Sequence, residues 1–427
     1  MNAKICLNLL RSYEIYYPFI KIIIDLYAHY HDNMQYMRGI SLFNRLLKIT
    51  IPINPIKGSG AAFLWGPRGT GKTTLLKQKF KKAKYIDLLD SDLCTEFIIR
   101  PKQLREEILA DEPEVVIVDE IQKVPQLIDE IHWLLENVKI KIILCGSSAR
   151  KLKKSGGNLL GGRAVTYELF PLTTAEISEI ELNRALNVGT IPIHYLSNEP
   201  RRLLKAYINN YIKEEIIEEA LTRNIPSFSR FLNTVALTHG QLLNYTNVAR
   251  ETGVSPNTVR DYYQILKDTL LGHDLEPWRK NKTRRLIETA KFYLFDVGIV
   301  NHLNPEIERV SEGSDVYGNA FEHFLIEEVR AWLSYNEKDY SLSFWRTVSG
   351  FEVDLIIGDL AVALEFKSAA KIKSMHLKGM RALKEENHVG RAIIVSRDIS
   401  YRKTEDNIEI MPWQQFCLSL WNNEILK

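Results

Sequence analysis

One stretch of the sequence has the residue types and spacing to hold phosphate. It reads Gly66-Pro-Arg-Gly-Thr-Gly-Lys-Thr73, which matches the pattern G-x-x-x-x-G-K-[ST]. Glycines let successive backbone N–H groups turn toward phosphate oxygens, and the N-terminus of a following helix adds the positive end of its dipole. Lys72 supplies a charge for the β- and γ-phosphates, and the Thr73 hydroxyl is a ligand for Mg²⁺. We therefore expect ATP and Mg²⁺ to bind here.

The residues expected to contact the nucleotide are Gly66, Pro67, Arg68, Gly69, Thr70, Gly71, Lys72, Thr73 and Thr74.

Two adjacent acids complete this predicted nucleotide site. The stretch Val115-Val-Ile-Val-Asp-Glu120 delivers them at the end of an apolar run. Ligands of open α/β sheets bind at the carboxyl ends of the strands. Asp119 is therefore expected in the Mg²⁺ shell, and Glu120 is expected to polarise the attacking water.

Two further polar residues adjoin predicted strands, and each has two interpretations. Ser147 follows the apolar run 140–146. It is expected to sense the γ-phosphate or to place the water, or else to cap the next helix, and these roles do not exclude one another. Arg163 precedes the next predicted strand. It either reaches the γ-phosphate of a neighbouring subunit as an arginine finger, which predicts a homo-oligomer, or is a solvated surface charge.

A second set of charges lies far downstream, on a predicted hairpin. The stretch 352–367 places Asp354 on one strand and both Glu365 and Lys367 on the next. Side chains two apart on a strand share a face. A preceding amphipathic helix carries Glu322. This order resembles that of PD-(D/E)XK nucleases, and the resemblance implies that the acids hold Mg²⁺ while the lysine orients or activates water. The alternative is a nuclease fold used only as a scaffold.

The elements that must position these residues are predicted by periodicity. From Ala61 onward strand and helix patterns alternate, as in a parallel α/β sheet. Short, β-branched runs at 61–65, 115–118 and 140–144 predict strands buried on both faces. A helix is expected over 73–80, and the chain turns helical after Pro171.

A helix-turn-helix pattern occupies residues 243–266. Gly253 ends the first helix, Ser255 fits the N-cap of the second, and Val259, Tyr262, Tyr263 and Leu266 form its apolar face. The pattern is either a DNA-binding winged helix or a packing module between domains. The DNA-binding interpretation places Asn257, Thr258 and Arg260 at a groove and Lys280, Lys282, Arg284 and Arg285 against phosphates.

Length and composition limit the remaining possibilities. A chain of 427 residues is long enough for two to four domains. The net charge of +3 gives no indication of a nucleic-acid partner, so any basic surface must be confined to one part of the protein. The four scattered cysteines favour reduced thiols in the cytosol. Lys21 and Asp25 interrupt the apolar stretch 16–27, so we expect neither a membrane helix nor a secretory signal, and a cytoplasmic protein.

The combination of motifs resembles a family of prokaryotic AAA+ P-loop ATPases. The resemblance is most specific over the stretches 118–125, 146–152, 161–163, 211–216 and 291–298. Together these stretches look like those of ATPases whose C-terminal half is domain of unknown function 4143. The resemblance covers about 37–400 and implies a winged helix and a restriction-endonuclease-like fold in that half. The expected fold class is thus α/β, with a parallel AAA+ sheet, a helical lid, a winged helix and a nuclease-like α/β domain.

The expected domains are a helical extension (1–36), the ATPase core (37–172), a lid or linker (173–230), the winged helix (231–300) and the nuclease-like domain (301–427).

Three functions fit these observations. The first is an ATPase whose nucleotide state switches a nucleic-acid-directed module, with or without Mg²⁺-dependent nuclease activity. The second is a nucleotide-gated DNA-binding regulator with a vestigial nuclease fold. The third is an ATP-driven protein remodeller.

Overall fold

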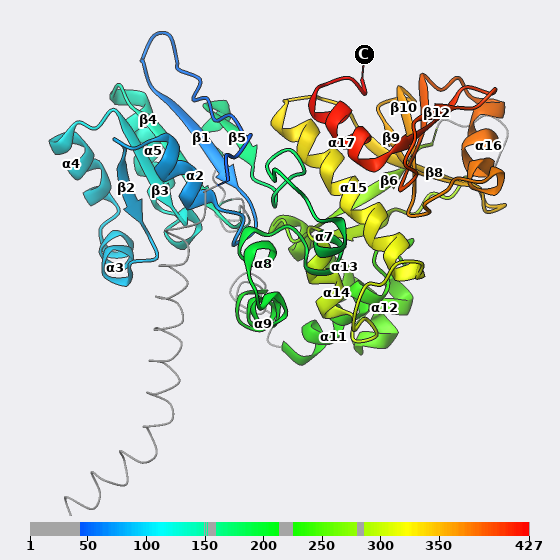
Figure 1. Ribbon diagram of the computed structural model, residues 1–427. Coiled ribbons are helices and arrows are strands. Elements are labelled where there is room, and N and C mark those ends of the chain that lie inside the picture. The colour runs from blue at the N-terminus through cyan, green and yellow to red at the C-terminus, as the bar shows by residue number, and fades with distance from the viewer. Residues whose placement is uncertain are drawn as a thin grey trace, which may run out of the picture. The chain divides into compact units, whose positions relative to one another are not determined.

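The computed structural model describes residues 43–148, 150, 152, 159–212, 225–279 and 286–426 (Figure 1). The predicted helical extension 1–36 and the basic residues Lys280, Lys282, Arg284 and Arg285 lie outside them. Contacts divide the chain after Asn44, and the residues from Arg45 onward form one compact unit.

The first sheet is parallel throughout, in the order β2-β3-β4-β1-β5 (Figure 1). Its strands are β1 (Gly60–Trp65), β2 (Lys84–Asp87), β3 (Val115–Asp119), β4 (Lys141–Gly146) and β5 (Ala164–Glu168). Its helices are α2 (Lys72–Lys79), α3 (Ser91–Ile99), α4 (Lys102–Asp111) and α5 (Leu127–Asn137). Every residue of β1 is buried, as expected of a strand covered on both faces. The predicted parallel α/β sheet is confirmed.

Helices dominate the middle of the chain. They are α7 (Leu182–Val188), α8 (Pro192–Leu196), α9 (Pro200–Ala206), a π-helical turn (Tyr207–Ile212), α11 (Ile225–Leu237), α12 (Tyr245–Thr252), α13 (Pro256–Asp268) and α14 (Val297–Leu303). The predicted helix-turn-helix is confirmed in α12 and α13. Gly253 ends α12 in the left-handed conformation, and the Ser255 hydroxyl accepts from the Thr258 N–H at 3.1 Å.

The second sheet has the order β12-β13-β11-β10-β9-β8-β6-β7. Its strands are β6 (Gly272–Pro277), β7 (Lys291–Leu294), β8 (Leu342–Arg346), β9 (Glu352–Ile357), β10 (Val362–Lys367), β11 (Arg391–Ser396), β12 (Arg402–Lys403) and β13 (Ile408–Pro412). Its helices are α15 (Asp315–Tyr335), α16 (Lys378–Glu386) and α17 (Trp413–Trp421).

The second sheet runs across the predicted domain boundary at 300/301. The hairpin of β6 and β7 follows the helix-turn-helix, and β6 pairs in parallel with β8. Strands 272–294 are therefore hydrogen-bonded into the same sheet as the C-terminal α/β domain. The β9–β10 hairpin is antiparallel, as predicted.

The buried side chain of Arg45 links the glycine-rich loop of the first sheet to helix α15 of the second. Arg45 pairs with Glu176 at 3.0 Å, and both side chains are almost fully buried. Its other nitrogens donate to the carbonyl oxygens of Thr70 and Phe170, each at 2.6 Å, and to the Tyr335 hydroxyl at 2.9 Å. Thr70 belongs to the glycine-rich loop and Tyr335 ends α15, so one guanidinium fixes both.

The Arg45 network predicts a large stability loss on substitution. Arg45→Met leaves the Glu176 carboxylate buried without its partner, which costs about 3–5 kcal/mol of unfolding free energy. The matched control is Arg100→Met, which breaks an exposed pair with Glu106 and should cost under about 1 kcal/mol. Urea unfolding measures both, and equal losses would contradict the importance of Arg45.

Candidate nucleotide site and acidic cleft

The glycine-rich loop connects the end of β1 to the start of α2, and its backbone needs glycine at three points. Gly69 and Gly71 have φ angles of +84° and +93°, in the region that side chains disfavour. At Gly66 a Cβ atom would lie 2.5 Å from the Leu169 carbonyl oxygen. The loop is thus held tightly against the chain that leaves β5.

Lys72 lies inside this loop. Its side chain is buried, and its ammonium donates to the carbonyl oxygens of Gly66 at 2.6 Å and Pro67 at 3.2 Å. The predicted phosphate-binding charge is therefore placed at the loop itself, where the N-terminus of α2 also points.

Thr73 and Asp119 meet at the carboxyl edge of the first sheet. The Thr73 hydroxyl donates to Asp119 Oδ2 at 2.7 Å. The Tyr85 hydroxyl donates to the same oxygen, and the Cys145 thiol donates to Oδ1 at 2.7 Å. A hydroxyl beside a carboxylate is the donor set expected for Mg²⁺ in such sites, so the residues fit this ion. The burial of Tyr85 and its bond to Asp119 raise the pKa of its phenol, which therefore stays a hydrogen-bond donor.

Glu120 and Ser147 are tied together by a residue that the sequence reasoning did not single out. The side-chain amide of Gln122 donates to the Glu120 carboxylate and, at 3.0 Å, to the Ser147 hydroxyl. Glu120 itself has a left-handed backbone, with φ 56°. The only signal for Gln122 was its place two residues after the acid, and its role depends on the neighbouring strand β4.

Arg163 lies at the opposite edge of the first sheet. β5 pairs in parallel with β1, with Ala164 beside Ala61, so Arg163 precedes the strands whereas the glycine-rich loop follows them. Five strand residues separate the two, roughly 16 Å. Arg163 forms an ion pair with Glu136 at 2.7 Å and is 44% exposed. It therefore does not reach the loop of its own chain, and the arginine-finger role stays a prediction about a neighbouring subunit.

Asp354, Glu365 and Lys367 converge on the β9–β10 hairpin. The Lys367 ammonium lies 2.6 Å from Glu365 Oε1 and 3.8 Å from Asp354 Oδ2. Asp354 also accepts from the Phe366 N–H at 2.7 Å. Burial raises the pKa of Asp354 to about 6. Burial and the nearby Asp354 charge raise the pKa of Glu365 well above its usual range.

Glu322 is held by other partners. It accepts from the Tyr293 hydroxyl at 2.7 Å and lies 3.6 Å from the Lys291 ammonium. Within the described ranges, no three or more His, Cys, Asp or Glu residues are placed to hold a metal ion together. With Lys367 between the other two acids, these residues do not offer a divalent ion a ready site. Metal binding by Glu322, Asp354 and Glu365 remains a prediction.

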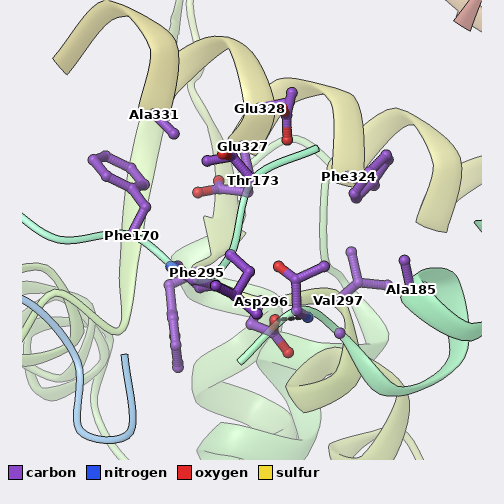
Figure 2. A pocket seen from close by; sticks show the side chains of 14 residues that line it. Phe170, Thr173, Ala185, Phe295, Asp296, Val297, Phe324, Glu327, Glu328 and Ala331 are labelled. Atoms are coloured by element: carbon purple, nitrogen blue, oxygen red, sulfur yellow. Dashed lines mark hydrogen bonds between the residues drawn. The ribbon is translucent and has the colours of Figure 1, made fainter. Parts of the chain in front are cut away.

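Further acids with structural roles lie where the segment that leaves the first sheet meets helices α14 and α15 (Figure 2). Figure 2 shows Glu327 and Glu328 of α15 and Asp296 around one small cavity of about 20 Å³, scarcely more than one water needs. Asp296 caps α14 and accepts from the Thr190 N–H at 2.9 Å. Glu328 accepts from the Thr174 N–H at 2.9 Å and the Trp421 indole at 2.5 Å. The Glu328 bond to Thr174 fastens the segment leaving the first sheet to α15, and the Asp296 bond to Thr190 fastens it to the start of α14.

The predicted DNA-contacting residues of α13 differ in their surroundings. Asn257 and Arg260 are exposed, and the Arg260 guanidinium lies 5.2 Å from the centre of the Tyr245 ring. The Thr258 hydroxyl lies 2.9 Å from the Ser255 hydroxyl, so it belongs to the helix cap. Val259, Tyr262, Tyr263 and Leu266 are buried, as predicted.

Comparisons with known proteins agree with this architecture. Residues 59–178 match the family described as an AAA domain, 180–309 match domain of unknown function 8612, and 317–416 match domain of unknown function 4143. The chain therefore combines an AAA domain with a C-terminal domain 4143, which confirms the resemblance inferred from the motifs. Across the described residues, no helix is both long and apolar enough to span a membrane.

Relatives occur in both bacteria and archaea. Uncharacterized proteins of Mycobacterium tuberculosis and Mycobacterium bovis are each 26% identical over 302 residues, covering 69% of this chain and 66% of their own length. The chain thus spans just under two thirds of these mycobacterial relatives. An uncharacterized protein of Methanocaldococcus jannaschii is 24% identical over 425 residues, covering 83% of this chain and 84% of its own.

Proposed function

We propose that the chain is an ATPase whose nucleotide state switches a nucleic-acid-directed C-terminal module. The observation that carries the proposal is the meeting of Thr73 with Asp119 beside Lys72 and Glu120. These residues come from the loop after β1 and the end of β3, and they lie at one sheet edge. The AAA match over 59–178 supports the same activity.

Each residue has a defined task in this proposal. The loop N–H groups and Lys72 hold the phosphates of ATP, and Thr73 with Asp119 holds Mg²⁺. When bound, Mg²⁺ neutralises charge on the phosphates that flank the breaking bond. Glu120 orients the attacking water and accepts its proton. Gln122 fixes the Glu120 carboxylate, and through Ser147 it ties that carboxylate to the end of β4.

Two contacts support the switching part of the proposal. Arg45 links the Thr70 carbonyl to Tyr335 at the end of α15. Glu328, two turns earlier on the same helix, binds Thr174 in the segment that leaves the first sheet. A nucleotide that shifts the loop would therefore act on α15 through Arg45, which is the kind of physical link that coupling between sites requires.

The ion pairs in the C-terminal domain help to choose among the alternatives. Lys367 pairs with Glu365 and contacts Asp354, which disfavours Mg²⁺-dependent cutting in this conformation. The exposed Asn257 and Arg260 on α13 favour a nucleic-acid partner over a remodelled protein.

The nucleotide site predicts two separable defects. Lys72→Ala should weaken ATP binding about ten- to a hundredfold, because a hydrogen bond to a charged group contributes about 1.5–3 kcal/mol. Glu120→Gln should retain ATP but turn it over about 10²–10⁴-fold more slowly. Calorimetric titration and phosphate release measure these effects. Lys77→Ala, an exposed lysine on the same helix, is the control. Unaltered binding in Lys72→Ala would refute the site.

Arg163 predicts complementation between subunits. Arg163→Ala should lower turnover by about 10³–10⁵-fold if it completes a neighbour's site, and mixing it with Glu120→Gln protein should restore part of the activity. Glu136→Gln removes the ion pair but keeps the arginine, so it should stay active. A chain that sediments as a monomer with ATP bound would exclude this arrangement.

The winged-helix proposal predicts salt-dependent DNA binding. Replacing Arg284 and Arg285 by alanine should lower the slope of log K against log[salt] by about 0.9 for each lost phosphate contact. Arg100→Ala, an exposed arginine of the first domain, should leave the slope unchanged. Fluorescence anisotropy with duplex DNA gives the slopes, and identical slopes for all three proteins would remove these arginines from the interface.

A further inference from the structure

A tyrosine from the helices in the middle of the chain contacts the glycine-rich loop. Tyr207 begins the π-helical turn that follows α9, and its hydroxyl donates to the Arg68 carbonyl oxygen at 2.9 Å. A Cβ atom on Gly69 would lie 3.8 Å from the Tyr207 ring and 3.2 Å from the Ile191 side chain. The segment 191–207, which contains α8 and α9, is therefore packed directly against the loop.

The ring of Tyr207 is held in place by a buried neighbour. The His194 ring packs edge-on against it, with 5.2 Å between the ring centres, and His194 is only 1% exposed. Burial, together with the smaller effect of the His302 charge, lowers the pKa of His194 to about 4. The His194 ring is therefore neutral at pH 7 and packs as an uncharged group. The Tyr207 hydroxyl thus has a fixed position from which it reaches the loop.

The contact falls on a peptide group whose orientation decides where the loop's N–H groups point. Residues 67–70 form a β-turn, closed by a hydrogen bond from the Thr70 N–H to the Pro67 carbonyl oxygen at 3.4 Å. Gly69 has φ +84°, as the third residue of a type II turn requires. Turns of types I and II differ by a flip of their central peptide group. In this turn the central peptide group joins Arg68 to Gly69.

The tyrosine hydroxyl favours one of these two orientations. In a planar trans peptide the C=O and the following N–H point in opposite directions. The hydrogen bond that holds the Arg68 carbonyl toward the tyrosine therefore turns the Gly69 N–H away from it. Arg45, through its 2.6 Å bond to the Thr70 carbonyl, directs the Gly71 N–H in the same manner. Backbone N–H groups oriented by such a loop are the groups that hold phosphate oxygens.

We propose that Tyr207 is a positioning residue for the phosphates of ATP. Its hydroxyl holds the Arg68–Gly69 peptide so that the Gly69 N–H faces the bound phosphates, and the loop reaches full affinity only while segment 191–207 is packed on it. By linkage, bound ATP stabilises the same contact. The inference rests on the proposed binding of ATP at this loop. It adds a connection from the loop to segment 191–207, separate from the one that Arg45 makes to α15.

The test compares how the full-length chain binds MgATP and magnesium tripolyphosphate, which has the phosphates without the nucleoside. Tyr207→Phe keeps the ring and removes the hydroxyl. It should weaken binding of both ligands by the same factor, about three- to tenfold, as expected for the loss of one hydrogen bond. In turnover, KM should rise more than kcat falls, because the Gly69 N–H contacts the phosphates both before and during the reaction. Titration calorimetry and phosphate release measure these effects.

The matched control is Tyr195→Phe. The Tyr195 hydroxyl accepts from the Glu181 N–H at 3.1 Å, so this variant loses a hydrogen bond in the same helical region and should keep both affinities. Equal affinities in the wild type and Tyr207→Phe would overturn the inference and leave the ATP site intact. Weaker ATP binding with unchanged tripolyphosphate binding would overturn it too, because the hydroxyl would then act on the nucleoside. A wild type that binds neither ligand would contradict the proposed function, and the inference with it.

Discussion

The Arg45 guanidinium is the point on which the arrangement of the two sheets depends. A buried charge must satisfy its donors within the protein. Arg45 does so with the Glu176 carboxylate, the Thr70 and Phe170 carbonyls and the Tyr335 hydroxyl. Separation of the glycine-rich loop, the segment leaving the first sheet or helix α15 would therefore leave buried N–H donors of Arg45 without acceptors.

Helix α15 extends that constraint toward the C-terminal domain. It has 21 residues, roughly 30 Å of helix, with Tyr335 at its C-terminal end and Glu322 about two turns from its N-terminal end. Glu328 lies between them and binds Thr174 and Trp421. The nucleotide loop and the acids of the C-terminal domain are thus attached to one rigid element. The two sites nonetheless differ in how they balance charge, since Asp119 is surrounded by neutral donors whereas the C-terminal acids have lysines.

Local patterns made much of the fold predictable. Each useful pattern involves residues that are neighbours in the chain: the glycine spacing of residues 66–73, the apolar run before Asp119 and the cap at Ser255. These patterns were sufficient to predict the strands and the helix-turn-helix. The two-residue period of strands placed Glu365 and Lys367 on one face, and their side chains are 2.6 Å apart.

Contacts between residues that are far apart in the sequence could not be predicted in this way. Arg45 contacts residues 131 and 290 positions away, and no local spacing singles it out. Glu322 was correctly placed on a helix, but Lys291 and Tyr293 decide which charge it meets. Lys291 itself stood out in the sequence only as the start of a strand, because its surroundings come from α15 and β9.

The central claim is that nucleotide binding at the loop reaches α15 through Arg45 and Tyr335. Hydrogen exchange of the Glu120→Gln chain, measured by mass spectrometry with and without Mg²⁺ and ATP, tests it most directly. We expect ATP to slow exchange both in residues 66–76 and in the last turn of α15, and Tyr335→Phe to remove the second effect alone. Protection confined to the loop, with α15 exchanging at the same rate in every state, would contradict the account.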